Sequence, residues 1–114
     1  MELNIVNGDY VPDGTGGLRR LQGAEEVLGR VLFRLTARRG SFPFLPELGS
    51  RLHRILRERP GARQALAAQY VAEALEAEQE IKVTGVEWQD RGAGGHLTVY
   101  LEWQGEALSL NMEL

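Results

Sequence analysis

The spacing of apolar residues changes once along this chain, and that change restricts its fold more than any other feature. Up to about residue 77 the apolar residues recur three or four positions apart, as on one face of a helix. From residue 81 they alternate with polar residues, as on one face of a strand. Neither a helical layer nor a sheet can bury such a stripe alone. The sequence therefore predicts an α+β fold with three helices packed on a three-stranded antiparallel meander.

The helical part contains three predicted helices, at residues 24–35, 46–59 and 62–77. In the first, the apolar stripe comprises Ala24, Val27, Leu28, Val31, Leu32 and Leu35. Gly29 interrupts this helix and predicts a close approach by another element. Pro46 suits the first turn of the second helix, because a helix needs no amide hydrogen there. Pro60 ends that helix, and the third follows directly.

Three strands are predicted at residues 81–88, 96–103 and 107–114, separated by the glycine-containing turns "RGAGG" and "QGE". The alternation of the first strand slips by one residue at Gly85, and a β-bulge would absorb the extra residue. The chain is thus a single domain with its sheet at residues 79–114 and its helical part at 18–78. Residues 1–17 form an N-terminal extension, where "LNIVNGDYV" predicts a β-hairpin turning at Asn7-Gly8.

The composition is that of an ordinary globular domain, but its charges are segregated. The net charge is −3, and the chain has no cysteine. Residues 19–63 carry a net +7 and residues 64–114 a net −7. This division predicts a basic and an acidic face. The N-terminus has neither the basic start nor the apolar stretch of a signal peptide, so we expect the protein to act in the cytoplasm or in a particle assembled there.

No arrangement of reactive side chains in the sequence predicts catalysis. His53 and His96 are 43 residues apart and lack carboxylates at metal-ligand spacing. Glu73 and Glu76 lie on the helix face expected to contact water, so nothing would raise the pKa of one acid for glycoside hydrolysis. The segment "DGTGG" lacks the lysine and hydroxyl residue of a phosphate-binding loop. We therefore expect no enzyme activity, no metal and no cofactor.

The junction between the first two predicted helices carries a recognisable motif. "LTARRG" spans residues 35–40 and "PELGSRL" spans residues 46–52, with the short apolar loop "SFPFL" between them. Together with the third helix, this pattern resembles the baseplate-wedge family of contractile phage tails, the W-type proteins often labelled "lysozyme-like". The resemblance covers residues 18–81, a little over half of the chain, and the N-terminal extension resembles the branch found in Gram-positive phages and phage-like elements.

The resemblance implies a structural subunit of the virion tail baseplate, which binds other wedge proteins and seats the first layer of tail sheath protein. The family usually has Glu-Pro-Arg where the third helix meets the first strand. Here that position reads Glu78-Gln79-Glu80, so only Glu78 carries over as a partner contact. Such a protein would have no small-molecule substrate, would not bind a membrane, and would not be expected to bind nucleic acid.

The residues of the motif divide into structural positions and candidate partner contacts. Gly40 is expected to supply a backbone conformation that other residues resist, and Gly49 and Ser50 are small enough for close packing. Phe42, Phe44 and Leu45 are expected to lie beneath the helices. The arginines that remain for an acidic partner surface, such as residues 73–80 of another copy, are Arg38, Arg39, Arg51 and Arg54.

The last strand is a second candidate contact, because it alternates regularly and has no proline or lysine to protect its edge. A strand of the sheath protein could add there through main-chain hydrogen bonds to residues of the segment Leu108, Ser109, Leu110, Asn111 and Met112. Alternatively, residues 3–6 of the same chain cover that edge. A regulatory adaptor, or a nucleic-acid-binding module that uses the basic residues 38–63, remains an alternative function.

Overall fold

A four-stranded antiparallel sheet forms one layer of the protein, and its strand order is β1-β4-β3-β2. The computed structural model describes the backbone of residues 3–6 and 15–114, and the side chains from Gly23 onward. The strands are β1 (Leu3–Val6), β2 (Ile81–Arg91), β3 (Gly94–Trp103) and β4 (Glu106–Glu113). The predicted α+β class and three-stranded meander are confirmed, and β1 adds a strand beside β4. The rest of the predicted N-terminal hairpin, including Asn7-Gly8, lies outside the described residues.

The register of the meander confirms the predicted bulge. Val83 pairs with Leu101 and Gly85 pairs with Tyr100, so Thr84 is the extra residue in β2. A Cβ atom at Gly85 would lie 3.3 Å from a ring carbon of Tyr100, which is why a residue without a side chain fits there.

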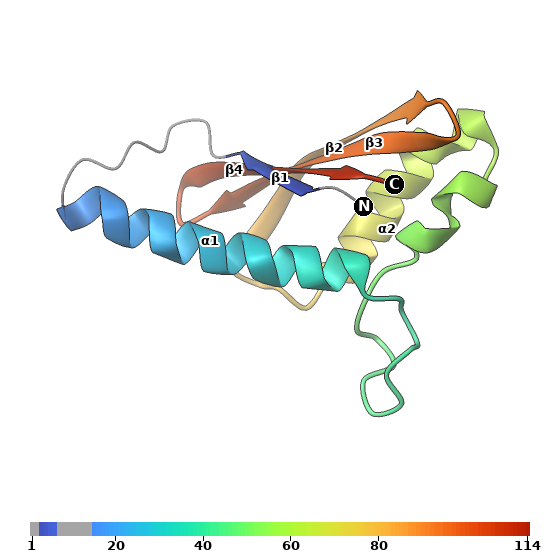
Figure 1. Ribbon diagram of the computed structural model, residues 1–114. Helices are drawn as coiled ribbons and strands as arrows, with labels where there is room; N and C mark the ends of the chain where they lie inside the picture. The colour runs from blue at the N-terminus through green and yellow to red at the C-terminus, as the bar shows by residue number, and fades with distance from the viewer. Residues whose placement is uncertain (1–2, 7–14) are drawn as a thin grey trace.

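Two α-helices and a short 3₁₀-helix occupy the three predicted helical regions, and they lie on one face of the sheet (Figure 1). The helical elements are α1 (Thr15–Thr36), η1 (Leu52–Arg57), η2 (Pro60–Ala62) and α2 (Arg63–Ala74). Helix α1 begins at Thr15, before the predicted start at residue 24 and inside the N-terminal extension. The glycines at positions 16 and 17 weaken a helix by only about 1 kcal/mol each and do not prevent it. None of the helices in the described part of the chain is both long and apolar enough to cross a membrane.

The predicted helix over residues 46–59 is wrong at its start. Gly49 has a φ of +104°, which a helix cannot include, so helical structure begins only at Leu52. Pro46 therefore lies in a turn of an irregular loop and not in the first turn of a helix.

The apolar stripes predicted from the sequence meet in one core between the helices and the sheet. Val31, Leu35 and Val71 of the two α-helices are 2% exposed or less. On the sheet, the buried side chains alternate as predicted and comprise Leu97, Val99, Leu101, Leu108, Leu110 and Met112. The opposite face of the sheet carries polar residues and no described helix.

The prediction that another element approaches Gly29 closely is wrong. The close approach is at Gly23, six residues earlier. A Cβ atom at Gly29 would meet nothing within 4 Å, whereas one at Gly23 would lie 2.8 Å from the indole ring of Trp103. The helix face that carries Gly23 is the one packed on the sheet, so the glycine permits the indole ring of Trp103 to lie against α1.

Candidate partner interfaces

The two halves of the "LTARRG…PELGSRL" motif contact each other at the base of the loop between α1 and η1. Arg38 and Ser50 form a parallel bridge, in which the Arg39 amide donates to the Ser50 carbonyl at 3.0 Å and the Ser50 amide donates to the Ala37 carbonyl at 2.8 Å. The Ser50 hydroxyl, 1% exposed, donates to the Leu35 carbonyl at 2.6 Å. The motif therefore ties the end of α1 to the start of η1.

The sequence predicts an unusual backbone conformation at Gly40 alone, but both glycines of the motif have one. Gly40 has a φ of +88°, in the left-handed region that glycine adopts at little cost. Gly49 also has a positive φ, and a Cβ atom there would lie 2.6 Å from the carbonyl oxygen of Ala37. The close packing expected at Gly49 and Ser50 is thus made against the backbone at the end of α1.

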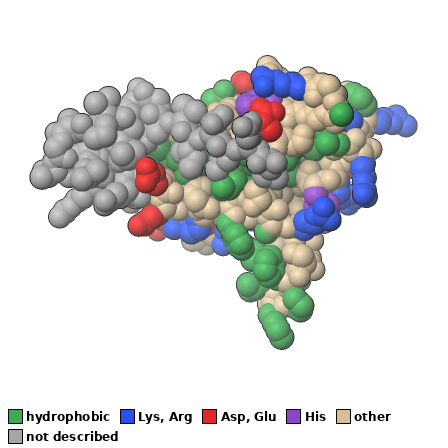
Figure 2. All heavy atoms as spheres, viewed as in Figure 1, with side chains coloured by type: hydrophobic (Ala, Val, Ile, Leu, Met, Phe, Trp, Pro, Cys, Tyr) green, Lys and Arg blue, Asp and Glu red, His purple; other side chains and the backbone are tan. Residues whose placement is uncertain are grey.

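The apolar side chains of the loop do not lie beneath the helices, so that expectation is wrong. Phe44 is 94% exposed, Leu45 57% and Phe42 38%. The loop projects from the end of α1 away from the sheet (Figure 1), and hydrophobic side chains cover its tip (Figure 2). The physical reason is the bridge between Arg38 and Ser50, which closes the base of the loop and leaves its tip without a surface to cover.

Two of the four predicted interface arginines contact an acid of their own chain. The guanidinium groups of Arg39 and Arg51 lie 3.8 and 3.3 Å from the carboxylate of Glu73 on α2. The fold therefore brings together charges that are segregated along the sequence. Arg39 and Arg51 contact Glu73 of their own chain, in place of the expected contact with residues 73–80 of another copy. Arg38 and Arg54 form no ion pair with any described residue.

Glu78, the residue carried over from the family's Glu-Pro-Arg pattern, is also held within the chain. The side chain of Arg30 donates to its carboxylate at 2.8 Å and that of Arg34 at 3.3 Å. Only 11% of the Glu78 side chain is exposed. In this conformation Glu78 fastens α1 to the segment that leads into β2, which is a structural role.

A basic cluster surrounds His53, beside the base of the loop. Burial lowers the pKa of the His53 side chain below 6.5, and the positive charges of Arg38, Arg54 and Arg57 lower it further, while a hydrogen bond with the Ser50 backbone raises it. The surface next to this cluster has a hollow of about 250 Å³, lined mainly by apolar residues of η1 and the chain end. We call Arg38, His53, Arg54 and Arg57 the basic cluster.

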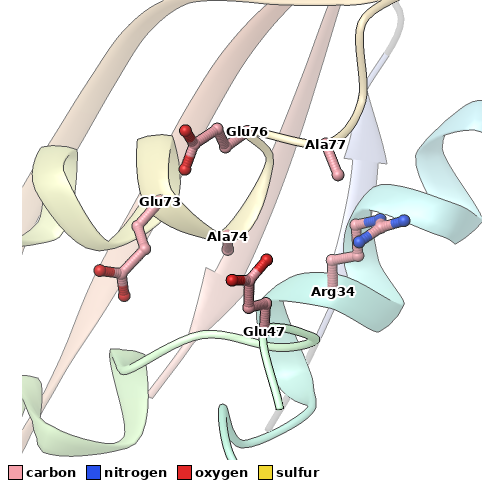
Figure 3. A pocket seen from close by; sticks show the side chains of 6 residues that line it. All are labelled: Arg34, Glu47, Glu73, Ala74, Glu76 and Ala77. Atoms are coloured by element: carbon pink, nitrogen blue, oxygen red, sulfur yellow. The ribbon is translucent and has the colours of Figure 1, made fainter. Parts of the chain in front are cut away.

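A second hollow, of about 310 Å³, opens between the end of α1, the loop and α2. Figure 3 shows that its walls carry the carboxylates of Glu47, Glu73 and Glu76 together with the guanidinium of Arg34. Among the described residues, no group of three or more histidines, cysteines or acids could hold a metal ion. Glu73 already contacts Arg39 and Arg51, so this hollow is part of the ion-pair network between the loop and α2.

The outer edge of β4 is not open at residues 109–112, contrary to the prediction. β1 pairs antiparallel with it, with Leu3 opposite Met112 and Val6 opposite Ser109. The alternative, that residues 3–6 cover this edge, is therefore the arrangement observed. The side chains of Leu108, Leu110 and Met112 point into the core and are buried.

The outer edge of β2 is closed in its centre by a side chain of α2. The Gln64 side-chain amide donates to the Val86 carbonyl at 2.7 Å, and its oxygen accepts from the Trp88 amide at 2.7 Å. Gln64 thus satisfies the same two backbone groups that an added strand would use. Arg63 reinforces this contact through its ion pair with Asp90 at 2.7 Å.

A polar network on the uncovered face of the sheet was not predicted. The His96 ring contacts the carboxylate of Glu113 through Nδ1 and the side-chain oxygen of Asn111 through Nε2, and Thr98 donates to the same oxygen at 2.9 Å. The two-residue turn at Gln104-Gly105 places Trp103 opposite Glu106, and counting back along both strands places His96 opposite Glu113. The position of this turn in the sequence could therefore have predicted that His96 and Glu113 are neighbours.

Comparison with known proteins adds no relative, since no family model and no curated protein matches this sequence.

Proposed function

We propose that this protein is a structural baseplate wedge subunit of a contractile phage tail or tail-like particle. The observation that carries the proposal is the bridge between Arg38 and Ser50, with Gly49 packed on Ala37. The residues that resemble the wedge family form one structural unit, although an irregular loop separates them in the sequence. The spacing of the motif thus has a physical reason, which supports the resemblance.

In this role the protein joins other wedge proteins and seats the first sheath layer, in a particle assembled in the host cytoplasm. The sheet favours one edge for an added sheath strand. Gln64 and the bulge at Gly85 obstruct β2, whereas β1 is the terminal strand on the other side of the described sheet. Strand addition is therefore proposed at the outer edge of β1 and no longer at β4.

The alternation of hydrogen bonds identifies which amides of β1 face outward. Gln64 binds the backbone of Val86 and Trp88, so the backbone groups of these two residues face the outer side of β2. The hydrogen-bonding direction alternates from one residue to the next along a strand. The registers of β2 with β3 and of β3 with β4 therefore direct the amides of Ser109 and Asn111 toward β1. Asn4 and Val6 then bond to β4, while the amides of Leu3 and Ile5 point away from the sheet.

Ion pairs within the chain weaken the nucleic-acid alternative. Of the basic segment at residues 38–63, Arg39 and Arg51 pair with Glu73, and Arg63 pairs with Asp90. A phosphate backbone would have to compete with these carboxylates. No specific contact favours the regulatory-adaptor alternative.

The test uses particles produced from the complete gene cluster, with two substitutions at one position. Ile5→Pro removes an outward-facing amide, and Ile5→Val keeps that amide and a strand-forming side chain. We expect both variants to be found in purified baseplates by mass spectrometry, and only Ile5→Pro to lack attached sheath in electron micrographs. Normal sheath on Ile5→Pro baseplates would exclude strand addition at β1, and absence of the wild-type chain from the particles would exclude the proposed function.

A further inference from the structure

The tip of the loop between α1 and η1 is an apolar surface that the protein itself does not cover. We call Phe42, Phe44 and Leu45 the apolar knob. Phe33 on the last turns of α1 is 51% exposed, and its ring centroid lies 6.3 Å from that of Phe42, so the apolar surface continues onto the helix. Contiguous exposed apolar patches of this kind mark interaction sites more often than isolated apolar residues do.

The knob is held in shape by its own backbone. The Ser41 amide and hydroxyl both donate to the Arg38 carbonyl, the Leu45 amide donates to the Phe42 carbonyl, and the Leu48 amide to the Leu45 carbonyl. Pro43 and Pro46 restrict the backbone further. A preformed loop loses little conformational entropy when it binds, so its exposed aromatic side chain is well suited to anchor a partner.

Positive charge adjoins the knob on one side. Arg38 begins the loop and belongs to the basic cluster, and Arg38, Arg54 and Arg57 form no ion pair with described residues. Figure 2 shows basic side chains next to a histidine on the surface above the projecting loop. A partner that receives the knob would therefore meet this cluster at the rim of the contact.

We infer that the apolar knob and the basic cluster together form a docking surface for a different protein of the particle. That protein would offer an apolar pocket to Phe44 and carboxylates to Arg38, Arg54 and Arg57. The inference rests on the proposed function, which supplies the particle, and it concerns a surface separate from the sheet edge at β1.

The charges of this chain favour a different polypeptide over a second copy. In the acidic segment at residues 73–80, the one considered above as another copy's contact surface, three of the four acids (Glu73, Glu78 and Glu80) already contact arginines of their own chain. The net charge and the lysine content of the chain also favour a protein partner over an anionic membrane. The chain carries a net charge of −3 with a single lysine, and arginine with aromatic residues is the combination enriched in protein interfaces, where lysine is depleted.

The experiment places a photo-crosslinking phenylalanine analogue at position 44 in the full-length chain within particles assembled from the complete gene cluster. After irradiation, mass spectrometry identifies the crosslinked peptide. We expect a peptide of another particle protein with acidic residues near the crosslink. A crosslink to a second copy of this chain, or none in particles that contain the chain, would overturn the inference and leave the proposed function standing.

Matched substitutions provide the second measurement. Phe44→Ser should leave the melting temperature unchanged because the side chain is almost fully exposed, yet reduce incorporation into particles roughly 30-fold, as loss of an aromatic anchor does. Tyr100→Ser, which removes a partly exposed aromatic from the sheet, should not reduce incorporation. Equal incorporation of Phe44→Ser and wild type would refute the inference. The inference would also be refuted if the purified wild type bound phosphatidylserine vesicles and Phe44→Ser did not, because that result would indicate a membrane partner. If the wild-type chain is absent from the particles, the proposed function and the inference fall together.

Discussion

The hydroxyl group of Ser50 donates a hydrogen bond to the carbonyl oxygen of Leu35 at 2.6 Å, across 15 residues of sequence. Leu35 is the penultimate residue of α1, so its carbonyl is one of the last four that a helix leaves without an internal partner. The Ser50 hydroxyl also accepts from the Leu52 amide at 3.2 Å, at the start of η1. A single buried hydroxyl thus satisfies polar groups at the ends of two helical segments.

Ser50→Ala should destabilise the protein by about 1–3 kcal/mol, because it leaves buried backbone groups without their partner. Ser41→Ala is the matched control, since the Ser41 hydroxyl also donates to a backbone carbonyl but is exposed to water. We expect the control to cost less than about 1 kcal/mol. Urea unfolding followed by circular dichroism measures both, and equal losses would show that the burial of Ser50 is not what matters.

Gly49→Ala should cost more stability than Gly40→Ala. Both positions have positive φ, so alanine at either is strained by about 1–2 kcal/mol. Only at position 49 would the new Cβ meet backbone atoms, 2.6 Å from the Ala37 carbonyl oxygen, which adds roughly 1–3 kcal/mol. The difference between the two free energies of unfolding isolates the steric term. A smaller loss at position 49 would contradict the close packing described at the loop base.

Gln64→Ala should open the centre of the β2 edge. The Trp88 amide would lose its acceptor, so its hydrogen exchange should accelerate, and stability should fall by about 1–2 kcal/mol for the two lost bonds. Gln69→Ala, at an exposed position of the same helix, is the control and should change neither quantity. Unchanged exchange at Trp88 in the first variant would mean that Gln64 does not cover the edge.

The ion pair between Arg51 and Glu73 should contribute little to stability, because half of the Arg51 side chain is exposed. A double-mutant cycle with Arg51→Ala and Glu73→Ala should give a coupling energy of about 0–1 kcal/mol that decreases at high salt. The same cycle with Arg54→Ala and Glu73→Ala should give none. A coupling of equal size for Arg54 would be evidence against the pairing seen here.

Arg38→Gln should raise the pKa of His53 toward 6.5 without reaching it, because burial, the larger cause of the lowered pKa, remains. Since the folded pKa is lowered, the unfolded chain binds more protons near pH 6.5, and His53 reduces stability as the pH falls below that value. Arg59→Gln is the control and should leave the pKa unchanged. Titration of the His53 ring by NMR distinguishes the two variants.

The sequence by itself determined the α+β class, the meander and the inward faces of the helices and strands. These features depend on the spacing of apolar side chains such as Val31, Val71 and Val99. That spacing can be read from a short stretch of sequence, and it favours one arrangement, in which the apolar side chains are buried on one face of the helix or strand. The bulge at Gly85 and the unusual backbone of Gly40 were predictable for a similar reason, since each follows from the conformational freedom of a single residue type.

Only the tertiary structure decided which residues remain for a partner. The sequence places Arg39 and Arg51 far from Glu73, and no local rule brings them together. Phe44 has the large apolar side chain typical of a core residue. It is nevertheless exposed, because the bridge between Arg38 and Ser50 closes the loop before its tip can reach the helices. The edge of β4 is likewise covered by a strand more than 100 residues away in sequence. Exposure, ion pairing and edge coverage depend on contacts between distant segments, so they are properties of the assembled fold and not of any stretch of the chain.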